Sequence, residues 1–349
     1  GGPLDFTLDP DIDFVPSEAC TVTVFAAQVS DQDADDPPDN MAADFSSTFT
    51  TVALPEFCGD PATFIHDIQG NGLESPMNGA TNVSIEGVVV GDFQGTGQFG
   101  GFYVQEEASD FDDDPATSEG IFVFSPSTPV SEGDIVRVRG DVTEFFSSGS
   151  TLTELTNVDE VQLCSSGNSV TPTDVVLPFD SLDFPERYEG MLVRLPQSLV
   201  ISEYFNFDRF GEIVLSSARQ NQPTAVVEPG APAIALTTQN LLDRITLDDG
   251  RTNQNPDPVI YPAPGLSAFN TMRGGDTTTG LTGVMHYLDT TEDFRIQPTG
   301  TVTWNHENPR PTDAPAVSGD LKVVGSNTLN YFTTVDNGPD VCGPAADQD

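Results

Sequence analysis

Apolar and polar positions alternate along much of the chain, and other apolar positions cluster in short runs rich in Val, Ile, Thr and Phe. Both patterns predict β-strands, because successive side chains of a strand point to opposite faces. The predicted strands fall at 21–29, 44–53, 83–91, 101–106, 120–124, 134–146, 151–163, 189–195, 198–205, 211–216, 277–286 and 294–303. Helical spacing is limited to one turn at 64–69 and a helix at 237–244. The predicted fold class is therefore all-β.

The grouping of the strands predicts the domain organisation. Residues 1–57 hold three or four strands, fewer than the roughly seven of a β-sandwich, and indicate a partial Ig-like segment. Five strands with a long fourth one suit a small closed barrel such as an OB-fold. We therefore expect one OB-like barrel over 58–170 and a second over 171–304, the latter with an insertion near 219–275. Residues 305–320 are predicted to be a Pro-rich linker.

The last part of the chain, 321–349, opens with LKVVGSNTLNYFTT, which reads as a strand. We interpret it either as the first strand of a truncated catalytic domain or as a strand donated to another subunit. In both cases the fold class includes a C-terminal strand after the two barrels.

Charge narrows the possible partners. The chain has 55 acidic and 12 basic residues and a net charge of −43. Such a surface repels phosphate backbones and acidic membranes, and it favours solubility in salt and the binding of divalent cations. This is typical of an acidic secreted protein or a salt-adapted one. No apolar run reaches the about 18 residues of a membrane span, so none is predicted.

The four cysteines are far apart, at Cys20, Cys58, Cys164 and Cys342. None forms a C-x-x-C pair, which excludes zinc-ribbon and thioredoxin-like readings. Wide spacing in an acidic chain predicts disulfides and an oxidising, extracellular location. Three pairings are open, and we favour Cys20 with Cys58 because the two bracket one segment.

Alternating aspartates suggest calcium. Carboxylates at every second position of a tight loop can converge on one hard cation, which Ca²⁺ is. The candidate ligands are Asp110, Asp112, Asp114 and Glu119, with a second set at Asp31, Asp33, Asp35 and Asp36 and a third at Asp9, Asp11 and Asp13. The first loop is not an EF-hand, because its sixth position is not Gly and Ile121 stands at its twelfth. The alternative is a solvated acidic turn.

Three other features of the sequence give weaker evidence of function. The GTGQFG run at 95–100 matches the dinucleotide fingerprint, but a strand follows it where a helix is required, so we expect a hairpin connection. The histidines His66, His286 and His306 stand singly and are expected to be structural. Arg137 and Arg139 share one face of a strand and could touch nucleic acid with nearby aromatic residues, or pair with surrounding acids.

Several segments together resemble one family. They are CGDPATFIHDIQG at 58–70, GGFYVQEE at 100–107, DPATSEGIFVF at 114–124, YEGMLVRLPQ at 188–197 and RIQPTG at 295–300. They are similar to the region upstream of the catalytic domain in large secreted bacterial nucleases of the ExeM type. The resemblance covers residues 58–335. It implies an OB-like module followed by an endonuclease/exonuclease/phosphatase domain.

The resemblance also bears on catalysis. LKVVGSNTLNYF looks like the first strand of that catalytic domain, and Asn327 and Asn330 match asparagines of the family's strand, the former near metal and phosphate. Gly325 and Ser326 depart from the small-Phe pair usual there. The family's metal-holding Glu, Asp and His groups lie further downstream than Asp349, and metal-assisted hydrolysis needs several such groups. The chain as given is therefore expected to be non-catalytic.

Two functions follow as expectations. The first is an extracellular structural module, stabilised by Ca²⁺ and disulfides, that polymerises head-to-tail into a filament when the tail 321–334 of one copy completes a sheet of the next. The alternative is an accessory domain that positions nucleic acid for a secreted, metal-dependent nuclease. In the first case the expected partner is a second copy of the chain. Nucleic acid is a less favoured partner, because the negative charge of the chain repels the phosphate backbone.

Overall fold

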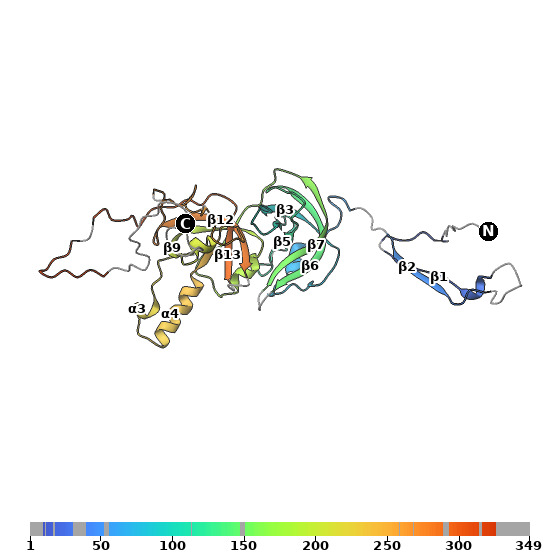
Figure 1. Ribbon diagram of the computed structural model, residues 1–349, viewed down its shortest axis with the longest axis horizontal. Helices are drawn as coiled ribbons and strands as arrows, with labels where there is room; N and C mark the ends of the chain where they lie inside the picture. The colour runs from blue at the N-terminus through green and yellow to red at the C-terminus, as the bar shows by residue number, and fades with distance from the viewer. Residues whose placement is uncertain are drawn as a thin grey trace, which may run out of the picture. The chain divides into compact units, whose positions relative to one another are not determined.

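The computed structural model describes residues 10, 12–16, 18–30, 40–51, 56–112, 114–146, 151–257, 259–267, 269–288, 293–313 and 316–325. The chain divides into two compact units, Gly1–Asn308 and Pro309–Asp349. The strands and helices described below lie in the first unit (Figure 1). Within it, strands dominate, as the alternation predicts.

The N-terminal segment contains a two-stranded antiparallel hairpin. β1 (Ala19–Val24) pairs with β2 (Phe45–Thr50), and a 3₁₀ turn, η1 (Ala26–Gln28), follows β1. Three or four strands were expected before residue 58, and the described residues there form two. Both strands are largely exposed, so the hairpin buries little apolar surface. The Ig-like assignment of this segment stays a prediction.

The first barrel is closed, as predicted for an OB-like fold. Its strands run in the order β3-β4-β5-β7-β6, and the parallel pairing of β5 with β7 completes the ring. A short helix, α1 (Ile65–Gln69), precedes β3, and its Ile65 and Ile68 are part of the barrel core. The strands are β3 (Val83–Phe93), β4 (Gly101–Gln105), β5 (Gly120–Phe124), β6 (Ile135–Phe146) and β7 (Thr151–Ser165).

The second barrel is also closed by five strands. Its order is β10-β11-β13-β12-β9, and β10 pairs back onto β9, while β8 extends the sheet beside β9. The strands are β8 (Thr173–Asp174), β9 (Leu192–Glu203), β10 (Ile213–Ser216), β11 (Ile245–Leu247), β12 (Thr277–Leu288) and β13 (Asp293–Pro298). The connecting helices are η2 (Phe184–Tyr188), α2 (Phe207–Phe210), α3 (Pro223–Val226) and α4 (Ala231–Leu242).

Three element predictions differ from the structure. The strands expected at 189–195 and 198–205 are one strand, β9, and the expected insertion 219–275 contains β11. The helix expected at 237–244 is α4, which begins six residues earlier, after Gly230 and with a proline in its first turn. Proline is well tolerated there because the first helical N–H groups have no intrahelical partner.

The C-terminal strand is not formed in the described part of 321–349. Residues 321–325 belong to no strand or helix, and Leu321, Val323 and Val324 are exposed. A strand requires a neighbour for its backbone hydrogen bonds, and these five residues show none. The remainder, including Asn327, Asn330 and Cys342, lies outside the described residues.

The favoured disulfide pairing is wrong. Cys58 is bonded to Cys164, with Cα atoms 5.6 Å apart, and Cys20 is free. Cys58 lies where the chain enters the first barrel and Cys164 lies near the end of β7, so barrel closure brings them together. Cys20 belongs to the separate β1–β2 hairpin. Nearness in sequence was therefore the wrong criterion.

The hairpin expected at residues 95–100 is confirmed. The GTGQFG run connects β3 to β4 as a hairpin, and no dinucleotide-type helix follows it. Among the described residues, no helix is long and apolar enough to cross a membrane.

Candidate functional site

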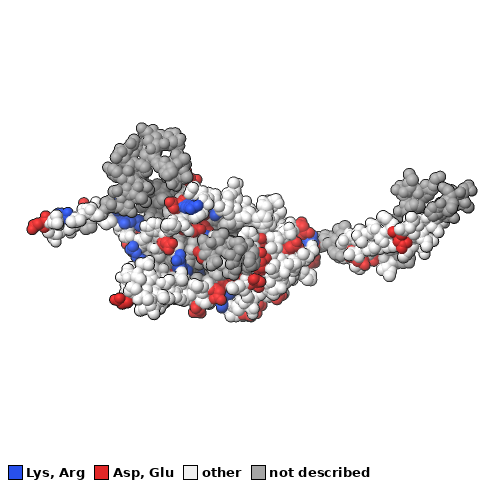
Figure 2. All heavy atoms as spheres, turned by 60° about the horizontal axis from the view of Figure 1, so that its bottom comes forward, with Lys and Arg blue, Asp and Glu red and all other residues white. Residues whose placement is uncertain are grey.

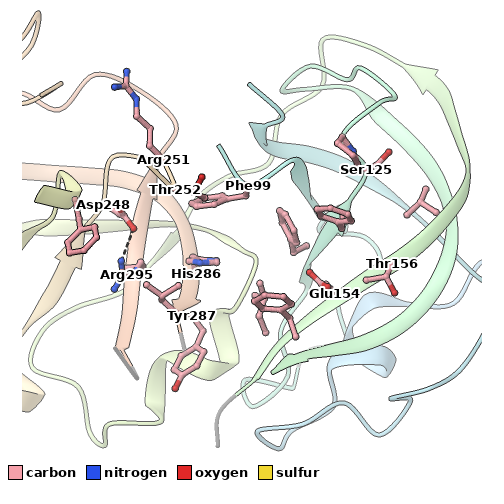
Figure 3. Close-up of a pocket in the computed structure, with 18 of the residues that line it drawn as sticks. Phe99, Ser125, Glu154, Thr156, Asp248, Arg251, Thr252, His286, Tyr287 and Arg295 are labelled. Atoms are coloured by element: carbon pink, nitrogen blue, oxygen red, sulfur yellow. Dashed lines mark hydrogen bonds and ion pairs between the residues drawn. The ribbon is translucent and has the colours of Figure 1, made fainter. Parts of the chain in front are cut away.

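A cavity of about 850 Å³ lies between the two barrels. This volume is within the range of small-molecule sites. The first barrel lines it from β5 and β7, and the second from β12 and β13 (Figure 3). Its aromatic residues come from both barrels: Phe99, Phe122, Phe124, Phe145, Phe210 and Tyr287.

Strand periodicity places these groups. Phe122 and Phe124 are two residues apart on β5 and so face the same side, as do Leu152, Glu154 and Thr156 on β7. Phe122 is buried in the wall, whereas Phe124 is 46% exposed. The cavity thus has an aromatic wall that is partly open to solvent.

The barrels meet beside the cavity through His286 of β12. Its Nδ1 is 2.6 Å from the hydroxyl oxygen of Tyr103 on β4, and its ring stacks on Phe99 with centroids 5.1 Å apart. Burial, with a contribution from the nearby positive charge of Arg295, lowers the pKa of His286 to about 3. Burial raises the pKa of Tyr103 well above its ordinary value. The pair is therefore a neutral hydrogen bond between the barrels.

A close backbone contact also holds the two barrels together. Gly120 of β5 packs so closely on Gly190 that a Cβ on Gly120 would lie 2.5 Å from the Gly190 carbonyl oxygen. Nearby, the backbone N–H of Leu192 donates to Oε1 of Gln105 at 2.8 Å. Only glycine allows this approach, so the relative placement of the cavity walls depends on it.

The cavity's charges are mostly paired or negative. Arg295 is 1% exposed, and its guanidinium binds Glu212 at 3.0 Å, Asp248 at 2.8 Å and Asp293 at 2.7 Å. Burial, and then the Glu144 carboxylate, raise the pKa of Glu154 to about 7. The cavity therefore presents a carboxylate that titrates near neutrality and an arginine whose charge is already compensated.

The two arginines that share a face of β6 are also paired with carboxylates. Arg137 binds Glu56 at 2.8 Å and Glu86 at 3.4 Å, and Arg139 binds the carboxylates of β7, including Asp159 at 3.0 Å. Figure 2 shows Lys and Arg side chains scattered among Asp and Glu on the face in view. The alternative that these arginines pair with surrounding acids is confirmed.

A second polar cluster lies at α1. The Nδ1 atom of His66 is 2.9 Å from Oε2 of Glu106 and 3.0 Å from Oε2 of Glu119. Glu106 directly follows β4 and Glu119 directly precedes β5, and these strand ends are joined by a backbone hydrogen bond of 3.0 Å. Burial, and then the neighbouring Glu119, raise the pKa of Glu106 to about 9.

Among the described residues, the predicted calcium ligands Asp110, Asp112, Asp114 and Glu119 do not form a cluster of their own. The Asp112 carboxylate accepts from the Asp114 N–H at 2.8 Å and from the Thr117 hydroxyl, and Asp114 accepts from the Ala116 N–H at 2.9 Å. The Asp112 and Asp114 carboxylates thus bind groups of their own loop, whereas Glu119 contacts His66 through Oε2 and the Asp112 N–H through Oε1. Calcium binding stays a prediction. The sets at Asp31, Asp33, Asp35 and Asp36 and at Asp9 and Asp11 lie outside the described residues, and Asp13 is exposed.

Sequence reasoning named Glu119 as a candidate metal ligand but missed its neighbours His66 and Glu106, and it missed the contact between His286 and Tyr103. His66 and His286 were expected to be structural, and nothing in the sequence links either of them to the buried carboxylates or to Tyr103. The single usable signal was the predicted turn at 64–69, which placed His66 on a short helix.

Comparison with known families gives one match. Residues 150–307 match a domain of unknown function, DUF8508. No curated protein matches the chain. The matched region runs from the start of β7 through the second barrel, which is less than half of the 349 residues, so it includes one wall of the cavity and part of the other.

Proposed function

We propose that the two barrels form a non-catalytic, extracellular module that handles a nucleic acid strand for a nuclease, taking unpaired bases into the cavity between them. The observation that carries this proposal is the aromatic wall that both barrels contribute to a cavity of about 850 Å³. OB-like folds use aromatic side chains in this way, and stacking is worth about 1–3 kcal/mol per base.

Polar groups around the cavity favour some bases over others. Glu154 is buried in the wall and offers an acceptor, as Figure 3 shows. Cytosine carries an amino group that can donate to it, whereas thymine has no exocyclic amino group. Oligodeoxycytidine is therefore expected to bind more tightly than oligodeoxythymidine.

The phosphates contribute nothing favourable in this proposal. The chain carries a net charge of −43, and Arg295 at the cavity and Arg137 on β6 are paired with carboxylates. A basic groove loses affinity as salt rises. Here salt screens repulsion between two polyanions, so affinity should stay level or rise with salt. The Cys58–Cys164 disulfide supports an oxidising, extracellular location.

Fluorescence anisotropy with labelled single strands tests the proposal. Phe124→Ala removes a partly exposed wall residue, and Phe269→Ala removes an exposed phenylalanine that does not line the cavity. We expect Phe124→Ala to weaken binding about 5- to 150-fold and Phe269→Ala to leave it unchanged. The absence of binding at any salt concentration, or equal effects of the two variants, would refute it.

One observation favours a second function, the structural module. The β1–β2 hairpin exposes Phe45 and Phe49, and Leu321, Val323 and Val324 are exposed without a partner strand among the described residues. An isolated two-stranded hairpin is marginally stable in water, and an added strand would cover it. We propose that residues 321–325 of a second copy add to this hairpin. Light scattering tests this: concentration-dependent polymers that Val323→Asp abolishes support it, and a monomer at all concentrations excludes it.

A further inference from the structure

The cluster around His66 joins three segments at the base of the first barrel. His66 belongs to α1, Glu106 follows β4 and Glu119 precedes β5. Their side chains are 10%, 2% and 6% exposed. Phe64 stacks on the imidazole of His66 with ring centroids 5.0 Å apart, which fixes the ring. Three donor atoms, one nitrogen and two oxygens, therefore converge at a buried point.

The cluster is short of positive charge. One imidazole nitrogen faces two carboxylate oxygens, and it carries at most one proton. Among the described residues, no Arg or Lys pairs with Glu106 or Glu119. Buried carboxylates are normally paired with a cation or coordinate a metal. A metal ion at this point would take the place of the proton that the raised pKa of Glu106 leaves on its carboxyl group.

We propose that His66, Glu106 and Glu119 bind one divalent transition metal ion of the Zn²⁺ class. Tetrahedral zinc with bonds of about 2.0–2.1 Å holds adjacent ligand atoms about 3.3 Å apart. The Nδ1 atom lies 2.9 and 3.0 Å from the two oxygens, and all three donor atoms lie within 4.8 Å of one another. An opening of a few tenths of an ångström admits the ion and leaves a fourth position for water.

The donor set disfavours calcium at the same point. Ca²⁺ takes six to eight oxygen ligands at about 2.3–2.6 Å, whereas this cluster offers three donors, one of them nitrogen. Imidazole nitrogen with carboxylate oxygen suits zinc and its neighbours in the first transition row. Glu119, predicted as a calcium ligand, is thus assigned to a different metal class.

The remaining carboxylate oxygens are already held. Oε1 of Glu106 accepts from the backbone N–H of Ile65, and Oε1 of Glu119 accepts from the N–H of Asp112 at 3.3 Å. Such outer contacts orient metal ligands and leave one oxygen of each carboxylate for the ion. The ion would clamp α1, whose Ile65 and Ile68 close the core, to the strand ends next to Gly120.

Metal content and spectroscopy of the full chain test the proposal. The protein is treated with chelator, dialysed against Zn²⁺ or Co²⁺ in high salt with excess Mg²⁺ to suppress surface binding, and assayed for bound metal and for the visible Co²⁺ spectrum. We expect one equivalent per chain and a tetrahedral Co²⁺ spectrum. Glu119→Gln and His66→Gln should weaken binding at least about 100-fold.

Asp110→Asn, in the adjacent acidic loop, removes a charge near Glu106 but no ligand of the cluster, and it should weaken binding far less than Glu119→Gln does. Circular dichroism of each variant checks folding, and the Co²⁺ spectrum of the unchanged protein needs no variant. Substoichiometric metal, an octahedral spectrum, or loss of binding in Asp110→Asn but not in Glu119→Gln would overturn the assignment.

Discussion

Replacing Glu154 by Gln should stabilise the protein above neutral pH, and this gain should nearly vanish in mild acid. Glu154 is 6% exposed, and burial together with Glu144 raises its pKa from 4.5 to about 7. The folded state therefore holds the proton more tightly than the unfolded chain. The contribution of protonated Glu154 to the free energy of unfolding is therefore fully present below pH 4.5, and it is lost as the pH rises through about 7.

The size of the effect follows from this shift. One pKa unit corresponds to about 1.4 kcal/mol, so ionising a buried Glu154 costs about 3 kcal/mol at pH 8 and about 1 kcal/mol or less at pH 5. Glutamine has nearly the same shape and no charge to bury. The stability gain of Glu154→Gln should thus be about 2 kcal/mol larger at pH 8 than at pH 5.

Urea unfolding followed by circular dichroism at pH 5, 6, 7 and 8 measures this difference. Glu228→Gln, at an exposed position, is the control and should change stability little at any pH. A gain that is equal at pH 5 and pH 8, or a loss at pH 8, would show that Glu154 is not buried as described.

Three further predictions concern the framework. Gly120→Ala should lower the free energy of unfolding, measured in urea, by at least about 1–3 kcal/mol, because a Cβ there meets the backbone that precedes β9. Gly300→Ala is the control, because a Cβ at Gly300 meets nothing within 4 Å. Equal effects of the two substitutions would contradict this prediction. Reducing Cys58–Cys164, 106 residues apart, should cost about 4.7 kcal/mol of unfolding free energy, and a loss below about 1 kcal/mol would contradict it. Arg295→Met should cost about 3–5 kcal/mol, measured by thermal unfolding, because it leaves three carboxylates without their common cation; an unchanged midpoint would contradict it.

Strand positions were largely predictable because alternation is local. The stretch 120–124 was predicted residue for residue as β5, and the starts of β3, β4, β7 and β12 were also correct. The error at β9 has a clear cause. The two predicted strands flank Pro196, and the register of β9 against β12 shifts at this point, between Thr279 and Leu281. Proline is tolerated at such an irregularity, so the strand continues through it.

The sites were not predictable because they depend on barrel closure. Positions 66, 106 and 119 meet only after α1 packs under the first barrel, and Tyr103 meets His286 only after the two barrels dock. Both barrels also require a parallel pairing between strands far apart in sequence, β5 with β7 in the first and β11 with β13 in the second. A one-dimensional pattern carries no information on such distant pairings.

The sequence alone determined that this protein is acidic and predicted that it is all-β, because charge and strand periodicity are read directly from residue order. Tertiary structure alone decided which cysteines pair, which carboxylates are buried and which arginines are compensated. Those outcomes depend on closure of the barrels. Closure brings some distant side chains within a few ångströms of one another and removes others from water. The same physical fact sets the pKa of Glu154 and His286, which in sequence are an ordinary acid and a lone histidine.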